Sequence, residues 1–165
     1  MRVLDLTDER GIYGTNLPAD LGAQVIRPES ATGDPLRQRG PFLQSKAGAL
    51  SLWHSFFASN RTFAQVDGAD PSARQTLQRL AEAADIICRC DQSDSAALVD
   101  IGAAKRANPG LVVVELSSFG KEGPWSDYLA PDIVAGALGG AAATTGDSST
   151  PPLKNFGDLN FMISG

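Results

Sequence analysis

The chain has 165 residues, enough for one domain with a hydrophobic core, and its 42% hydrophobic and 20% charged residues are typical of globular proteins. The net charge of -5 and the pI near 4.7 disfavour nucleic-acid binding, which needs a basic face, but a few local arginines could still bind a polyanion. We find no apolar run of membrane-helix length and no signal-peptide pattern, so we expect a cytoplasmic protein with no membrane segment.

The first part of the chain contains three short apolar runs of strand length. Strands are predicted at residues 2–6 and 24–26, and a third candidate lies at residues 63–66. Residues 29–47 show no clear period and contain several Gly and Pro breakers. We therefore expect an irregular connection there.

Helices and strands alternate after residue 70. Residues 73–84 follow the period of about 3.6 residues of an amphipathic helix, and Asp70-Pro71 before them suits a cap and a first turn. A buried strand at 85–88 and a helix over 96–107 follow. Residues 111–116 are a continuous β-branched run, which favours a strand covered on both faces.

This alternation predicts an α/β fold with a Rossmann-like, doubly wound and mainly parallel sheet. In such sheets ligands bind beyond the carboxyl ends of the strands, here after Cys88 and after Leu116. The segment 117–125 is rich in glycine and hydroxyl groups. It is either a ligand-facing loop or an ordinary turn.

The C-terminal part is rich in small residues. Residues 136–150 are either flexible or, within 133–143, part of a closely packed helix. Residues 159–165 have the apolar pattern of the first turns of a helix that the chain does not finish. We therefore expect the chain to be part of a longer protein.

The cysteines and the histidine do not form a metal-site pattern. Cys88 and Cys90 are too close together to cross-link the fold usefully, and His54, the only histidine, is far from them in sequence. We expect two buried thiols, no bound metal, and a structural role for His54 among its apolar neighbours.

Several short motifs follow one another along almost the whole chain, and their order resembles the class III CoA-transferases, the family of formyl-CoA and carnitine CoA-transferases and α-methylacyl-CoA racemase. The motifs are Asp5-Leu6-Thr7, PADLGAQVIRPE at 18–29, Gly33-Asp34-Pro35-Leu36-Arg37, Arg39-Gly40-Pro41-Phe42, Ala58-Ser59-Asn60-Arg61, Ala84-Asp85-Ile86-Ile87-Cys88, residues 108–124, and GGAAATTG at 139–146.

The resemblance implies that residues 1–165 are the N-terminal portion of an interlocked CoA-transferase fold, with the C-terminal half and a small domain outside this chain. In the family, an aspartate attacks an acyl-CoA thioester, and the reaction passes through an anhydride and an aspartyl-CoA thioester to a carboxylate acceptor. The implied partners are acyl-CoA, with coenzyme A as co-substrate, a carboxylic acid, and either a second copy of the chain or a second transferase domain.

Asp158 is the acidic residue nearest to the family's nucleophile position. The family aspartate precedes a helix-opening glycine by four residues, whereas Asp158 precedes Gly165 by seven and Phe161 occupies the four-residue position. The alternative is that Asp158 caps the following helix, a position that aspartate favours in any protein.

The resemblance also implies CoA contacts. Arg37 is the candidate for the phosphates, with Arg10 and Arg39 as weaker ones. The family's Asn-Phe-Arg-Pro-Gly segment is replaced by residues 90–94, so Cys90 and Asp91 border the expected site and added carboxylates weaken CoA binding. The glycines expected to give backbone donors for the oxyanion are Gly120, Gly139 and Gly140.

Two functions remain open from the sequence: a CoA-transferase that uses Asp158, and a non-catalytic domain that binds a partner subunit or a second domain. Phe161 and the lost Asn-Phe-Arg-Pro-Gly segment favour the second function. A generic dinucleotide binder is disfavoured because no G-x-G-x-x-G turn follows the first strand. Racemase-type proton transfer is disfavoured because the family's His-Asp pair is Pro131-Asp132 here.

Overall fold

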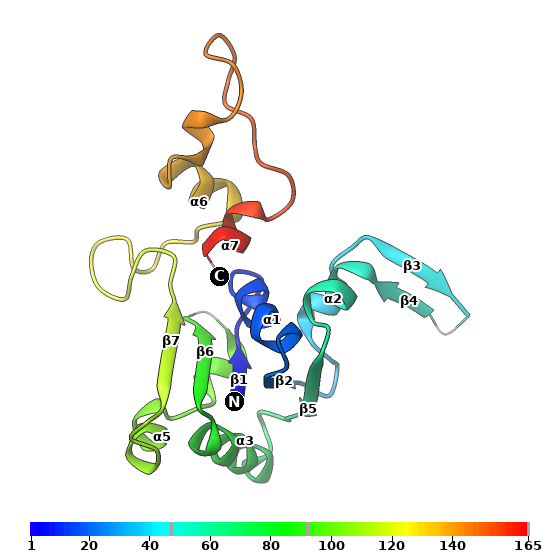
Figure 1. Ribbon diagram of the computed structural model, residues 1–165, viewed down its shortest axis with the longest axis vertical. Helices are drawn as coiled ribbons and strands as arrows, with labels where there is room; N and C mark the ends of the chain where they lie inside the picture. The colour runs from blue at the N-terminus through cyan, green and yellow to red at the C-terminus, as the bar shows by residue number, and fades with distance from the viewer. Residues whose placement is uncertain (47, 92, 165) are drawn as a thin grey trace.

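The computed structural model describes residues 1–46, 48–91 and 93–164, and its centre is a five-stranded parallel sheet (Figure 1). The strand order β5-β2-β1-β6-β7 confirms the predicted α/β class and the mainly parallel sheet. The strands are β1 (Arg2–Leu6), β2 (Gln24–Glu29), β5 (Arg61–Gln65), β6 (Ile86–Cys90) and β7 (Val112–Leu116).

Helices cover both faces of this sheet. One face carries α3 (Pro71–Ala83), α4 (Asp94–Ala97) and α5 (Ile101–Ala107), and the other carries α1 (Ile12–Asp20) and α2 (Leu52–Phe57). This doubly wound arrangement is the one expected for strands that alternate with helices.

The alternation of side chains along β1 explains the two layers. Leu4 and Leu6 are buried against the face that carries α3, whereas Val3 packs with Ala19 of α1 on the opposite face. In α3, the predicted apolar face is confirmed by Leu77, which is completely buried. Burying a leucine of this kind stabilises the fold by roughly 1.5–3 kcal/mol.

Three predictions about elements were wrong in part. The helix expected over 96–107 is broken into α4 and α5, because the Asp100 side chain accepts a hydrogen bond from Ala103 N and starts a new helix. Strand β7 is an edge strand, and Val112 and Val114 are 53% and 44% exposed, so the run is not covered on both faces. The connection at 29–47 contains the 3-10 turn η1 (Pro35–Gln38) and a strand, with residue 47 outside the described part.

That strand, β3 (Phe42–Ser45), pairs with β4 (Gly48–Ser51) in an antiparallel hairpin that extends away from the sheet in Figure 1. The chain after β7 forms a separate layer with α6 (Asp132–Leu138), the 3-10 turn η2 (Ala141–Thr144) and α7 (Leu159–Ser164). The helix considered for 133–143 thus ends at Gly139, and a helix at 159–164 is confirmed. None of the helices within the described ranges is both long and apolar enough to cross a bilayer.

The topology marks where a ligand can bind. From β1 the chain goes to β2 and β5 on one side, and β6 and β7 lie on the other side. The strand order therefore reverses between β1 and β6, and the loops that leave these two strands diverge at the carboxyl edge of the sheet. Open α/β sheets bind their ligands at such a point.

Candidate functional site

A cleft of about 450 Å³ lies at this carboxyl edge. Its wall is formed by the residues that follow four of the parallel strands, together with the turn before η1. The lining residues are Thr7, Asp8, Glu9, Arg27, Pro28, Glu29, Ser30, Asp34, Pro35, Leu36, Val66, Gly68, Ser93, Asp94, Ser95 and Leu98. The volume suits a small molecule or part of a cofactor-sized one.

The cleft has an acidic wall and many hydroxyl groups. Asp8, Glu9 and Asp94 line it beside the hydroxyls of Thr7 and Ser93. Hydroxyls and carboxylates accept hydrogen bonds from ribose, amide or amine groups. Carboxylates repel phosphate, so this composition fits the uncharged parts of a nucleotide better than its phosphates.

A buried ionic network forms the floor of the cleft. The Arg27 guanidinium donates from Nε to Asp34 Oδ2 over 2.5 Å and from Nη1 to Asp5 Oδ2 over 3.0 Å. Asp5 also accepts hydrogen bonds from Thr7 Oγ1, at 2.6 Å, and from Thr15 Oγ1, at 3.1 Å. The network joins β1, β2 and α1 to the turn before η1, so it fixes the shape of the cleft floor.

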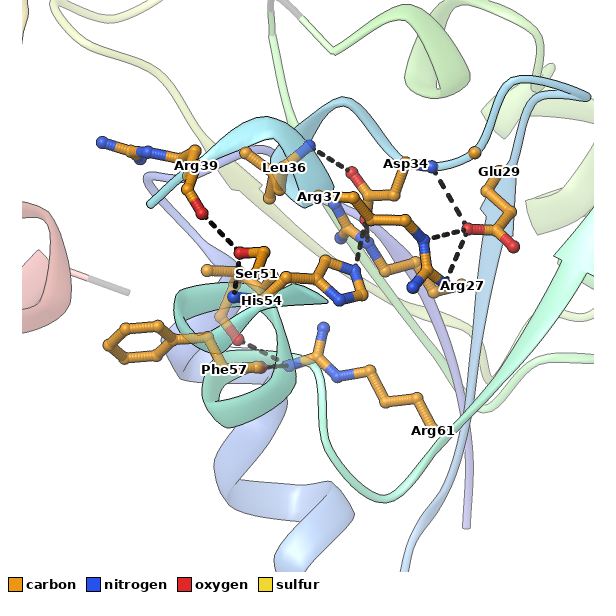
Figure 2. A network of polar contacts seen from close by, with 12 residues as sticks. Arg27, Glu29, Asp34, Leu36, Arg37, Arg39, Ser51, His54, Phe57 and Arg61 are labelled. Atoms are coloured by element: carbon orange, nitrogen blue, oxygen red, sulfur yellow. Dashed lines mark hydrogen bonds and ion pairs between the residues drawn. The ribbon is translucent and has the colours of Figure 1, made fainter. Parts of the chain in front are cut away.

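Arg61 completes this network from strand β5. It pairs with Asp5 and donates from Nη2 to the carbonyl oxygen of Ile12 over 2.7 Å. The same Nη2 donates to the carbonyl oxygen of Phe57 over 2.8 Å (Figure 2). Burial lowers the pKa of Arg61, and the charge of Asp5 opposes that effect. Two arginines thus share one fully buried carboxylate, and neither is directed into solvent.

Asp34 and His54 meet at the side of the network shown in Figure 2. His54 is 5% exposed, its Nε2 lies 3.5 Å from Asp34 Oδ2, and its ring packs on Phe63 with centroids 5.5 Å apart. Burial alone would raise the pKa of Asp34, but His54 and Arg27 lower it well below its usual value. His54 thus packs on an apolar ring, as expected, but also lies beside a buried carboxylate; its structural role stays a prediction.

Arg10 follows β1 and is bound on two sides. Its Nη2 lies 2.5 Å from Asp8 Oδ2, its Nη1 lies 2.8 Å from Asp91 Oδ1, and Nη1 also donates to Ser118 Oγ over 3.0 Å. Burial lowers the pKa of Arg10, but the bond to Asp8 raises it above its ordinary value. Arg10 therefore links the loops after β1, β6 and β7, and two carboxylates already neutralise its charge.

The two cysteines lie on β6 as free thiols; Cys90 is buried as predicted, whereas Cys88 is only half-buried. Cys90 is completely buried beside Asp8 and Gly11, and burial raises the pKa of its thiol, with the charge of Asp8 adding to the effect. Burial and the charge of Asp5 raise the pKa of Cys88 to about 11. Cys90 therefore lies behind Asp8, a residue of the cleft wall, with its thiol enclosed.

Arg37 lies on η1 beside the cleft. Its Nη2 is 3.0 Å from Glu29 Oε2 (Figure 2). Its guanidinium also stacks 4.7 Å from the centre of the Phe63 ring. The side chain is 39% exposed, so it can reach an anion at the rim of the cleft without leaving Glu29.

Asp158 lies immediately before α7, outside the cleft lining. The Arg39 Nη2 atom is 2.7 Å from Asp158 Oδ2, and the Arg39 guanidinium stacks 4.7 Å from the Trp53 ring centre. The Asp158 side chain is 16% exposed. Two segments that are 119 residues apart in sequence, 158 minus 39, thus meet through one ion pair.

Hydrogen bonds to α6 hold α7 in place. Asp132, at the start of α6, accepts from Phe161 N over 3.1 Å and from Asn160 Nδ2 over 2.9 Å. Met162 packs against the apolar cluster that includes Ile12 and Phe57. These contacts fix the helix that follows Asp158 against both α6 and the body of the protein.

Of the three predicted glycines, Gly120 lies apart from the adjacent Gly139 and Gly140. Gly120, with φ +82°, follows β7, where its N–H donates to Ser117 Oγ over 3.1 Å. Gly139 and Gly140 end α6, and Gly140 has φ +84°. Because α6 has seven residues, they lie about 10 Å along the helix from its Asp132 end, which is the end that α7 binds.

The structure therefore brings some of the predicted site residues together and separates others. Arg10, Cys90 and Asp91 meet around Asp8, which lines the cleft, Arg37 pairs with Glu29, another lining residue, and Asp158 lies in the C-terminal layer. Sequence reasoning missed Arg27 and Asp34. A charged residue inside the apolar run of β2 is the signal that could have pointed to Arg27.

Comparison with known proteins gives consistent matches. The family described as CoA-transferase family III matches residues 1–165. The subunit BbsE of succinyl-CoA:(R)-benzylsuccinate CoA-transferase from Thauera aromatica is 32% identical over 157 residues, 93% of this chain and 38% of that protein. Formyl-CoA:oxalate CoA-transferase from Streptomyces avermitilis is 30% identical over 170 residues, 100% of this chain and 40% of that protein.

The structural comparison supports the fold. A crystal structure of a CAIB/BAIF family protein from Brucella suis superposes with a TM-score of 0.84 at 24% identity, over 99% of this chain and 46% of that one. The chain thus spans about two-fifths of the length of these two curated relatives.

Proposed function

Because the chain belongs to CoA-transferase family III, we propose that it forms the N-terminal part of an enzyme that transfers CoA from an acyl-CoA thioester to a carboxylic acid. Asp158 is the proposed nucleophile. Curated relatives named as transferases of succinyl-CoA or formyl-CoA support this class of substrates.

The proposed reaction begins when an Asp158 carboxylate oxygen attacks the thioester carbonyl carbon. The carbon–sulfur bond breaks, CoA leaves as a thiolate, and a mixed anhydride forms. The thiolate then attacks the Asp158 carbonyl carbon, which releases the first acid as a carboxylate and leaves an aspartyl-CoA thioester.

The second acid repeats these steps in reverse. Its carboxylate attacks the aspartyl-CoA thioester and expels the thiolate, which then takes the new acyl group from the anhydride. The products are the new acyl-CoA and the original Asp158 carboxylate. The cycle consumes no water and no net proton. The residues around Asp158 must therefore keep water away from the anhydride and the thioester.

We place CoA at the carboxyl edge of the sheet. The hydroxyls of Thr7 and Ser93 can bind the ribose, and Arg37 at the rim is the cation for a phosphate. The acidic wall of the cleft and the two carboxylates on Arg10 disfavour phosphates deeper inside. CoA therefore fits the cleft best when its phosphates lie at the rim and its uncharged parts lie inside.

The observation that carries the proposal is the Asp158–Arg39 pair. It places a carboxylate at the start of a fixed helix, within a chain whose whole length matches the family. The test uses the full-length protein and measures CoA transfer between an acyl-CoA and an acid. After incubation with acyl-CoA, peptide mass mapping should find CoA joined to Asp158 with loss of one water.

Replacement of the nucleophile should lower kcat by about 10³-fold or more in Asp158→Ala. Asp147→Ala is the matched control, because Asp147 is an exposed carboxylate in the same C-terminal segment. Full transfer activity in Asp158→Ala would show that another group is the nucleophile.

A second function is favoured by one observation, the occupation of Arg10 by Asp8 and Asp91. With that cation neutralised, the chain could act as a non-catalytic domain that pairs with a second chain, and the relative BbsE is itself named a subunit. Calorimetric titration of the protein with CoA separates the two functions, because only the transferase must bind CoA.

A further inference from the structure

We propose that Arg39 is the binding site for the carboxylate of the acid substrate, and that it exchanges Asp158 for this carboxylate during each reaction cycle. The inference rests on the proposed function, because it needs Asp158 to be acylated. It assigns a specificity-determining residue to the acid half of the reaction.

The position of Arg39 is fixed from several sides. Its carbonyl oxygen accepts a hydrogen bond from Ser51 Oγ, and the same hydroxyl accepts from His54 N at the start of α2 (Figure 2). The guanidinium stacks on Trp53, the second residue of that helix. In Figure 2 the Arg39 side chain points away from the Arg27–Asp34 network, so the charges of that network do not occupy it.

Arg39 has unused hydrogen-bonding capacity. Its Nη2 pairs with Asp158, but its Nη1 is buried and has no hydrogen-bond partner within the described residues. Arginine commonly binds carboxylates through two parallel N–H groups. A carboxylate that takes the place of Asp158 on Nη2 could reach the enclosed Nη1 with its second oxygen, and the Arg39 side chain as a whole is 34% exposed.

The other arginines described above, Arg10, Arg27 and Arg37, pair with carboxylates that take no part in the proposed reaction. Arg27 is enclosed by Asp5 and Asp34, and Arg10 by Asp8 and Asp91. Arg37 pairs with Glu29 at the rim. None of these carboxylates changes charge in the proposed reaction.

Asp158 differs because its charge disappears when it becomes an anhydride or a thioester. Arg39 then loses its partner at 2.7 Å, and a partly buried cation without a counter-ion is unfavourable. At the aspartyl-CoA stage, however, the first acid has just been released as a carboxylate, and the second acid must bind as a carboxylate. Charge balance therefore provides a substrate anion for Arg39 whenever Asp158 is a thioester.

This exchange also orients the acid. A carboxylate on Arg39 lies where the Asp158 carboxylate lay, next to the acylated carbonyl carbon that it must attack. When the cycle is complete, Asp158 regains its charge and competes with the bound acid for Arg39. The same ion pair that positions the resting nucleophile thus assists release of unreacted acid.

The experiment compares the full-length protein with Arg39→Gln, Arg39→Lys and the control Arg106→Gln, an exposed arginine on α5. Transfer of label from the free acid into its thioester is measured with succinate and succinyl-CoA, and with formate and formyl-CoA. In parallel, mass spectrometry measures the amount of aspartyl-CoA formed in a single turnover without added acid.

In Arg39→Gln the KM for the acid should rise about 10- to 100-fold, because charge-assisted hydrogen bonds are lost. The KM for acyl-CoA should stay within about threefold of that of the unmodified protein, because binding of acyl-CoA needs no acid. The yield of aspartyl-CoA should fall, because the pair that positions Asp158 is lost. The KM of Arg39→Lys for the acid should lie between those of Arg39→Gln and the unmodified protein. If Arg39→Gln does not fold, Arg39→Lys is the variant that tests the inference. Arg106→Gln should match the unmodified protein.

An unchanged KM for the acid in both Arg39 variants would overturn the inference while leaving the proposed function intact. The inference would also be overturned, and the proposed function left intact, if the KM for acyl-CoA rose as much as the KM for the acid. If the unmodified protein exchanges label with neither acid and forms no aspartyl-CoA, the proposed function fails, and the inference fails with it.

Discussion

Arg27 and Asp34 form an ion pair of 2.5 Å in which both side chains are almost completely buried. The pair connects β2, a central strand, to the turn that begins η1. Each partner makes one more contact. Arg27 also donates to Asp5, and Asp34 accepts a hydrogen bond from Leu36 N over 2.9 Å. The pair therefore stabilises both the sheet and the loop that carries Arg37 and Arg39.

The Arg27–Asp34 pair should make the stability of the protein depend on pH, and loss of the pair should weaken that dependence. The folded-state pKa of Asp34 is lowered, so its contribution is fully present above the unfolded pKa of about 4 and is lost as the pH falls below that value. Asp34→Asn should lower the free energy of unfolding by about 3–5 kcal/mol at pH 7, and by less at pH 3. Urea unfolding at both pH values measures the difference, and an equal loss at pH 7 and pH 3 would contradict it.

A methyl group at Gly136 should disturb the helix that follows Asp158. A Cβ at this position would lie 2.7 Å from Asn160 Nδ2, the group that bonds α7 to Asp132. Gly136→Ala should therefore shift α7 and lower the transfer rate by about 10- to 100-fold, since small displacements of reacting groups are costly.

Gly110→Ala is the control for that substitution, because a Cβ there makes only an ordinary contact of 3.5 Å with Asn108 Oδ1. Steady-state kinetics of the full-length protein gives the rates, and circular dichroism checks that the sheet remains folded. Equal rates in the two variants would mean that the α6–α7 contact does not position Asp158.

The thiols on β6 should react slowly in the folded protein. With a pKa of about 11 for Cys88, only about 10⁻³ of this thiol is ionised at pH 8, and the buried Cys90 has a higher pKa still. Iodoacetamide labelling followed by mass spectrometry should find little modification until urea unfolds the chain. Fast labelling of the native protein at Cys90 would show that β6 opens locally.

The parallel sheet was predictable from the sequence because each strand is a short apolar run between clear breaks. Residues 2–6 match β1 in both bounds, and the helix at 73–84 differs from α3 by two residues at its start and one at its end. The break at Asp100 was missed, because a capping aspartate inside a helical period is visible only when its side chain bonds the next turn.

The candidate site was predictable only in pieces. The family resemblance named Arg10, Arg37 and Asp158 as candidates, but spacing along the chain cannot show that Arg10 is held by Asp8 and Asp91. It also cannot pair Arg39 with Asp158, because long-range contacts depend on how the layers pack. The weakened phosphate site stays a prediction. Of the two carboxylates in the segment that replaces the family's Asn-Phe-Arg-Pro-Gly, Asp94 lines the cleft and Asp91 pairs with Arg10.

The layer after β7 is attached to the rest of the protein differently from the other helices. Residues 117–131 lead to it without regular helix or strand, and α7 returns to the body through Met162 and the Arg39–Asp158 pair. Segments with few buried contacts open more readily than the sheet. We expect a ligand that contacts both Arg39 and α7 to stabilise the packing of this layer against the body. Substrate binding should then reduce local opening of the layer and protect it from proteolysis and hydrogen exchange.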